Sequence, residues 1–160
     1  MRDGFIEIEK LSIPSDFGSI SNIEVLIDNI CSKLKVNEDY YGNVLIAVTE
    51  AVNNAIEHGN KLDSAVNVEL RVGEKEGVFC FRVKDFGGGF DFDNLPDPTS
   101  PENLEKENGR GIYLIKSLAD EVVLGSFGMG LEGFWGVSGN LSYIYYTTNN
   151  TLKDFLDFVQ

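Results

Sequence analysis

In VKDFGGGFDF, residues 83–92, an apolar strand-like run ends at Asp85 and is followed by three consecutive glycines. Folding penalises a glycine run, because each glycine loses more backbone freedom than any other residue. A tight turn that needs a positive φ explains one glycine, but seldom three in a row. A backbone without side chains would also let a flat ligand lie against it, beside a carboxylate able to bind an exocyclic amine. The stretch therefore indicates either a turn or a ligand-binding surface.

The stretch TEAVNNAIEHGN, residues 49–60, lies upstream and belongs to a predicted helix from about Asn37 to His58. Apolar residues recur along this helix at the spacing of one buried face: Val44, Val48, Val52 and Ala55. Gly59 follows directly and suits a left-handed cap. We therefore expect a long helix that packs on a sheet and ends at His58.

Three polar residues of this helix, Glu50, Asn54 and Glu57, lie together on its opposite side, because positions three or four apart are neighbours. A solvated helix face explains them. However, asparagine is a mediocre helix former and a good neutral oxygen ligand for Mg²⁺. A carboxylate one turn away would take a proton from a nucleophile. The helix alone leaves both interpretations open.

Downstream, NGRGIYLI, residues 108–115, places Gly109 and Gly111 on either side of Arg110, where another helix begins. Free backbone N–H groups at a helix start attract phosphate, and a guanidinium group adds bidentate contacts. Ordinary capping is the alternative explanation. Taken singly, this motif does not decide between them.

The remaining patterns complete the order strand, helix, helix, two strands, long loop, helix, strands. The predicted elements are a strand at 5–13, a helix at 20–34, strands at 66–72 and 78–85, a helix at 111–122, and a strand at 141–148. This order lacks the regular alternation of a parallel doubly wound sheet. We predict an α+β fold, with a mixed, mainly antiparallel sheet and helices on one face. The other face would be solvated or covered by a partner.

The loop at 91–111 contains every proline except Pro14, and its length favours a functional lid or disorder. Its Asp91, Asp93 and Glu102 match the offsets of a calcium loop, but Pro96 stands where that loop requires glycine. Calcium binding is therefore rejected.

Composition limits the possible functions. The formal charge of -13 argues against sequence-independent binding to nucleic acid, which requires a basic surface. Neither a signal-peptide layout nor an apolar run of about 18 residues is present, so we expect a cytoplasmic protein without a membrane span. Cys31 and Cys80 are expected to be buried free thiols, and His58 to be structural.

The three motifs, in this order and spacing, resemble those of the GHKL ATPases, or histidine kinase-like ATPase superfamily. They are most similar to those of the bacterial anti-sigma factor serine/threonine-protein kinases. IAVTEAVNNAIEHGN resembles the N box of that family, VKDFGGGFD its first glycine motif, and residues 95–122 its lid and second glycine motif. The likeness covers residues from about 5 to 124. The glycine-rich stretch at 125–139 departs from the family's closing strand pair.

The resemblance implies a two-layer α/β sandwich, the Bergerat fold, that binds ATP and Mg²⁺ between its helix layer and lid. It implies one domain at 1–147, with a lid at about 91–108 and a tail at 148–160. Carried over by position, Glu50 is the general base and Asn54 the Mg²⁺ ligand. The other implied roles are adenine recognition by Asp85, close ring approach at Gly87 and Gly89, and phosphate binding by Gly109, Arg110 and Gly111.

The resemblance also implies a function: phosphorylation of a serine on an anti-sigma antagonist protein, and sequestration of a sigma factor, by a homodimer. The acidic surface suits a basic sigma-factor partner. The alternative is a non-catalytic module that binds proteins in an ATP-dependent way. The ATP-binding half of a histidine kinase is disfavoured, because no phosphoacceptor-histidine helix pair precedes the domain and the single histidine is His58.

Overall fold

The computed structural model describes residues 4–75, 78–87, 97–103, 110–119, 121–127 and 139–147. The strands are β1 (Ile6–Pro14), β2 (Asn67–Lys75), β3 (Val78–Lys84), β4 (Glu121–Phe127) and β5 (Gly139–Thr147). The α-helices are α1 (Ile20–Lys33), α2 (Glu38–Asn54) and α3 (Arg110–Leu118). Short helical turns are η1 (Phe17–Ser19), η2 (Ala55–Gly59), which is π-helical, and η3 (Pro101–Asn103).

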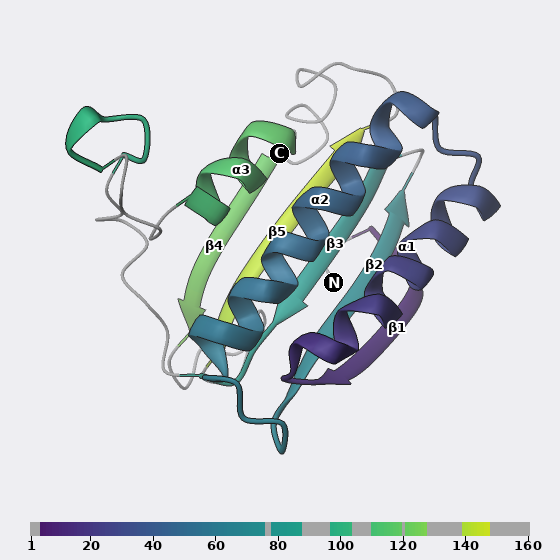
Figure 1. Cartoon of the computed structure of the whole chain (residues 1–160). Coiled ribbons are helices and arrows are strands. Elements are labelled where there is room, and N and C mark those ends of the chain that lie inside the picture. Colours follow the sequence, from purple (N-terminus) through teal and green to yellow (C-terminus); the bar gives the residue numbers. More distant parts are fainter. Residues whose placement is uncertain are drawn as a thin grey trace.

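The strands form one sheet in the order β1-β2-β3-β5-β4, and every neighbouring pair is antiparallel. The three α-helices lie side by side on one face of this sheet, with α2 in the middle (Figure 1). The predicted two-layer α+β fold is therefore confirmed. The sequence also predicted a mixed sheet, with some parallel strand pairs. No parallel pair occurs among the strands that the structure describes.

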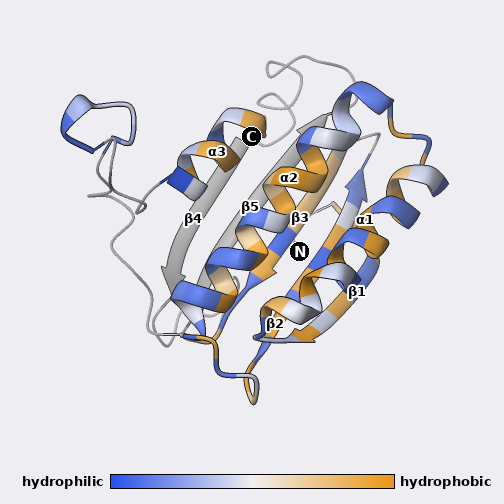
Figure 2. Cartoon of the chain, in the orientation of Figure 1, coloured by the Kyte–Doolittle hydropathy of each residue, from blue (hydrophilic) through white to orange (hydrophobic). Residues whose placement is uncertain are grey.

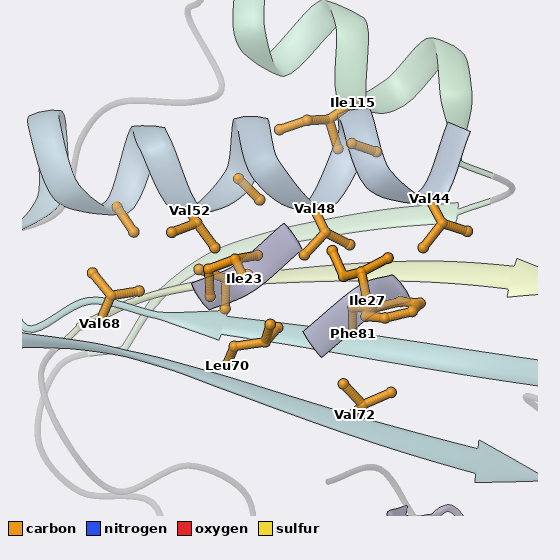
Figure 3. Close-up of a cluster of buried hydrophobic side chains, with 14 of the residues drawn as sticks. Ile23, Ile27, Val44, Val48, Val52, Val68, Leu70, Val72, Phe81 and Ile115 are labelled. Atoms are coloured by element: carbon orange, nitrogen blue, oxygen red, sulfur yellow. The ribbon is translucent and has the colours of Figure 1, made fainter. Parts of the chain in front are cut away.

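The helix α2 supplies the centre of the core, as its apolar spacing predicts. Val44, Val48 and Val52 point from α2 toward the sheet, where Leu70 and Phe81 lie beneath them (Figure 3). All five side chains are buried. Figure 2 shows the apolar residues of α2 interrupted by hydrophilic ones along the helix. One flank of α2 therefore packs on the sheet, and polar side chains lie on another flank.

The turn between β1 and α1 is closed by Asp16. Its Oδ1 accepts a hydrogen bond from the Ser19 N–H at 3.0 Å, as expected of a cap. Ser15, the preceding residue, donates its hydroxyl proton to the Val66 carbonyl and is fully buried. Asp16 is therefore the capping residue, and Ser15 ties the end of β1 to the loop before β2.

The sheet face away from the helices carries charged side chains on β1 and β2. Arg71 Nη1 lies 3.3 Å from Glu7 Oε2, and Arg71 Nη2 lies 3.6 Å from Glu69 Oε2. All three side chains remain between a quarter and two-fifths exposed, so these pairs add little stability. This part of the face is solvated.

Two predicted helix ends were wrong. The regular helix stops at Asn54 rather than His58, because a π-helical turn follows it, and Gly59 is not a left-handed cap. Gly4 is the one glycine with a positive φ in the described part of the chain. Residues 121–122 belong to β4 rather than to the preceding helix, because pairing with β5 overrides the short helical pattern there.

The cysteine prediction is confirmed, since Cys31 and Cys80 are both buried and free. Burial, and then the nearby Asp28 carboxylate, raise the pKa of the Cys31 thiol. No helix in the described ranges has the length and apolar character to cross a bilayer. The tail at 148–160 and most of the predicted lid lie outside the described residues.

Candidate functional site

The structure brings Glu50 and Asn54 of α2 against the first turn of α3. A Cβ built on Gly111 would lie 3.0 Å from Glu50 Oε2 and 3.2 Å from both Asn54 Nδ2 and Asn54 Oδ1. The carboxylate and the amide therefore flank the same point of the α3 backbone. The absence of a side chain at Gly111 leaves room for this approach.

Glu57, predicted to lie on the same polar face, is not part of this cluster. It is exposed, and its Oε2 lies 4.0 Å from His58 Nε2. Its side chain and that of His58 are each about half exposed, at 54% and 50%. His58 therefore lies at the surface beside Glu57, and its structural role stays a prediction.

The amide nitrogen of Asn54 is buried and has no hydrogen-bond partner among the described residues. Such groups are rare in folded proteins because an unpaired buried donor loses its hydration without compensation. Rotation of the amide exchanges nitrogen and oxygen, so Asn54 can offer a donor or an acceptor at this point. The group has the properties expected of a contact to a bound ligand.

The donor set around Asn54 fits Mg²⁺ carried by a phosphate ligand. The described residues hold no cluster of three or more His, Cys, Asp or Glu side chains that would bind a metal by themselves. Mg²⁺ usually takes only one or two protein ligands and completes its octahedron with phosphate oxygens and water. One amide oxygen beside the open backbone of Gly111 meets that requirement.

A second cluster forms where β3 ends. Asp85 is only 5% exposed and packs directly against Gly59, the last residue of the π-helical turn. A Cβ on Gly59 would lie 2.6 Å from the Asp85 Cβ, and one on Gly87 would lie 2.6 Å from the Gly59 carbonyl carbon. Both distances are too short for real atoms. Gly59 therefore lacks a side chain because the Asp85 side chain fills that space, and Gly87 because the Gly59 backbone does; neither needs a positive φ.

The carboxylate of Asp85 is oriented by its own loop, because the Gly87 N–H donates to Asp85 Oδ1 at 2.9 Å. Next to it, Phe86 is 41% exposed, and Lys84 Nζ lies 4.5 Å from the centre of its ring. The loop after β3 thus combines a buried carboxylate, a side-chain-free backbone and an accessible aromatic ring.

The remaining predicted site residues are less completely described. Arg110 is exposed and is the first residue of α3. Gly89 and Gly109 lie outside the described residues, as do residues 91–96 and 104–108 of the predicted lid. In the described part of that segment, Asp97 accepts hydrogen bonds from the Thr99 hydroxyl at 2.7 Å and N–H at 2.8 Å, which lower the Asp97 pKa.

Sequence reasoning missed Asn60, although it is the last residue of the quoted stretch TEAVNNAIEHGN. Asn60 is 6% exposed, and its Oδ1 accepts a hydrogen bond from the Phe86 N–H at 2.8 Å. In a sequence, an asparagine directly after a helix-ending glycine is typical of an ordinary loop residue. Its location at the end of that stretch was the available signal.

A cavity of about 320 Å³ lies elsewhere, at the turn between α1 and α2. Cys31 and Tyr41 are among its lining residues, and none of the predicted site residues is. Burial, and then Asp28, raise the pKa of Tyr41. The cavity is therefore separate from both clusters.

The family model of the histidine kinase-like ATPase domain matches residues 13–131 of the chain. Serine-protein kinase RsbW of Bacillus licheniformis is 33% identical over 124 residues, which cover 74% of this chain and 76% of the relative. RsbW of Bacillus subtilis is 30% identical over 119 residues, covering 71% and 74%.

The fold is also found in a solved structure, that of the RsbU and RsbW domains of a Mycobacterium tuberculosis protein. The TM-score is 0.59 at 13% identity, and the match covers 87% of this chain. Our chain spans 31% of that longer chain. At this identity the match supports the fold alone.

We expect opposite effects on stability from two glycine-to-alanine substitutions, one at the contact between Gly59 and Asp85 and one away from it. Gly59→Ala should lower the free energy of unfolding by about 1–3 kcal/mol, because the new methyl group overlaps the Asp85 side chain. Gly42→Ala is the matched control: a Cβ there meets nothing within 4 Å, and alanine should stabilise α2 by about 0.5–1 kcal/mol. Urea denaturation measures both. A Gly59→Ala chain as stable as the unsubstituted protein would contradict the contact.

Proposed function

Because the chain belongs to the histidine kinase-like ATPase family and, within it, to the bacterial anti-sigma factor serine kinases, we propose that it is an ATP-dependent protein serine kinase. Its substrate would be a serine of an anti-sigma antagonist protein, and its other partner a sigma factor that it sequesters. The observation that carries the proposal is the approach of Glu50 and Asn54 to Gly111 at the start of α3.

Glu50 acts as the general base. Its carboxylate would accept the proton of the attacking serine hydroxyl as the serine oxygen bonds to the terminal phosphorus. The bond from that phosphorus to its bridging oxygen would break, and ADP would leave. Phosphoryl transfer passes through a loose transition state, so a kinase contributes mainly positioning and charge neutralisation. A single carboxylate next to a phosphate-binding helix start is therefore a sufficient base.

Asn54 and the start of α3 hold the triphosphate. The Asn54 amide oxygen would hold Mg²⁺, which would neutralise charge on the phosphate oxygens. Gly109, Arg110 and Gly111 surround the first turn of α3, where free N–H groups and a guanidinium favour an anion. The buried Asn54 amide nitrogen, which has no hydrogen-bond partner among the described residues, supports this role, because rotation of the amide would present its oxygen at the same point.

Asp85 recognises adenine. Its carboxylate would accept a hydrogen bond from the exocyclic amine, and the backbone at Gly87 and Gly89 would let the ring lie close. The burial of Asp85 at the end of β3 supports this role, since a buried carboxylate makes a stronger and more selective hydrogen bond than an exposed one.

The proposal extends to the whole chain and its setting. One ATP-binding domain would span residues 1–147, with a lid at about 91–108 closing over the nucleotide. The protein would be a cytoplasmic homodimer, since ATP and sigma factors are cytoplasmic. Its formal charge of -13 favours basic protein partners over nucleic acid.

Glu50→Ala should abolish transfer of labelled phosphate from [γ-³²P]ATP to a candidate antagonist, with a fall in rate of about 100-fold or more. ATP binding should be retained, because Glu50 acts on the hydroxyl rather than on the nucleotide. Glu57→Ala is the matched control on the same helical segment, and it should transfer phosphate at the normal rate because Glu57 is exposed. Gel autoradiography and phosphoamino-acid analysis measure the transfer.

The same assay separates the two candidate functions. If the unsubstituted protein binds ATP but transfers no phosphate to serine in any candidate antagonist, the kinase assignment fails. The alternative, a non-catalytic ATP-dependent binding module, would then remain. Equal transfer by Glu50→Ala and the unsubstituted protein would refute the role of Glu50.

Asn54→Ala should raise the Mg²⁺ concentration needed for half-maximal ATP binding by at least about tenfold. The reason is the loss of the proposed amide ligand. Asn53→Ala changes the same residue type one position earlier on α2 and should leave that concentration unchanged. A fluorescent ATP analogue titrated with Mg²⁺ measures both. Equal Mg²⁺ requirements in the two variants would refute the role of Asn54.

A further inference from the structure

Asn60 connects three segments that are far apart in the sequence. Its Oδ1 accepts a hydrogen bond from the Phe86 N–H at 2.8 Å, in the loop after β3. Its Nδ2 donates to the Ser15 hydroxyl at 2.9 Å, after β1, and to the Asn67 carbonyl at 3.1 Å, at the start of β2. Asn60 itself directly follows the π-helical turn. One side chain thus joins the ends of α2, β1, β2 and β3.

The orientation of this amide is unambiguous. A backbone N–H can only donate, so the atom facing Phe86 must be the amide oxygen. A backbone carbonyl can only accept, so the atom facing Asn67 must be the amide nitrogen. With 6% exposure, the side chain is almost completely shielded from solvent. Its position is therefore fixed by partners on both sides.

These contacts reach Asp85 through the backbone. Asn60 holds the N–H of residue 86, the Gly87 N–H holds Asp85 Oδ1, and Gly59 packs against the Asp85 side chain. The two adjacent residues Gly59 and Asn60 thus determine where the Asp85 carboxylate lies. The π-helical turn brings both to the end of β3, and such turns often occur at functional sites.

We propose that Asn60 is a positioning residue for base recognition, which sets the Asp85 carboxylate and so the preference for nucleotides whose purine carries an exocyclic amine at C6. This inference rests on the proposed function, because it assumes that Asp85 binds the nucleobase. Asn60 itself touches neither ligand nor phosphate in this account. Its effect is on selectivity between bases, not on the transfer step.

The test compares dissociation constants for ATP and for inosine triphosphate, which has a carbonyl where adenine has its amine. The unsubstituted protein should prefer ATP. In Asn60→Ala, ATP should bind about tenfold or more weakly while inosine triphosphate binds as before, because the buried Phe86 N–H loses its acceptor and the loop shifts. If Asn60 were important only for stability, its substitution would weaken the binding of both nucleotides alike.

Ser15→Ala is the matched control. It removes a fully buried hydroxyl that accepts from the same amide, but leaves the bond from the Phe86 N–H to Asn60 intact. It should therefore cost stability and still preserve the preference for ATP. If Asn60→Ala folds and retains that preference, or if Ser15→Ala loses it equally, the positioning role is overturned.

A measurement on the unsubstituted protein covers the case in which Asn60→Ala does not fold. The Phe86 amide should exchange slowly with solvent, and ATP should slow it further than saturating inosine triphosphate does. Equal slowing by the two nucleotides would overturn the inference. Failure of the unsubstituted protein to bind either nucleotide would instead overturn the proposed function as well, so the two failures are distinguishable.

Discussion

The contact between Gly59 and Asp85 is the constraint on which both parts of the site depend. It joins the end of the helical segment that carries Glu50 and Asn54 to the end of β3, and it is possible only because Gly59 has no side chain. Asn54 and Gly59 are five residues apart, at the two ends of the π-helical turn. Two clusters that come from distant parts of the sequence are therefore held at a fixed spacing by one short turn.

The helix α2 presents its apolar side chains on one flank and the candidate site residues on another. Val48 and Val52 are fully buried above the sheet, and this fixes the rotation of the helix. That rotation places Glu50 and Asn54 beside α3, whose own orientation is fixed by the burial of Ile115. The polar groups are thus held by apolar packing. The core compensates for the cost of the buried Asn54 amide nitrogen, which has no hydrogen-bond partner among the described residues.

Much of the fold could be predicted because local patterns agreed with it: the apolar spacing of α2 identified its buried face. The role of Gly59 could not, because its reason is a contact with Asp85, 26 positions away in the sequence, and helix-ending glycines usually indicate a left-handed cap. Asn60 was missed for the same cause, since a buried asparagine and a loop asparagine look identical in sequence. The sequence motifs identified Glu50, Asn54 and Gly111 as candidates. They did not show that Glu50 and Asn54 lie beside Gly111.

The central claim is that the buried Asp85 carboxylate binds adenine. Calorimetric titration with ATP and Mg²⁺, on the unsubstituted protein and on Asp85→Asn, tests it most directly. The account predicts saturable binding with one nucleotide per chain, and binding weakened about tenfold or more in Asp85→Asn at unchanged circular dichroism. No heat from the folded, unsubstituted protein at millimolar ATP, or equal affinity in Asp85→Asn, would contradict it.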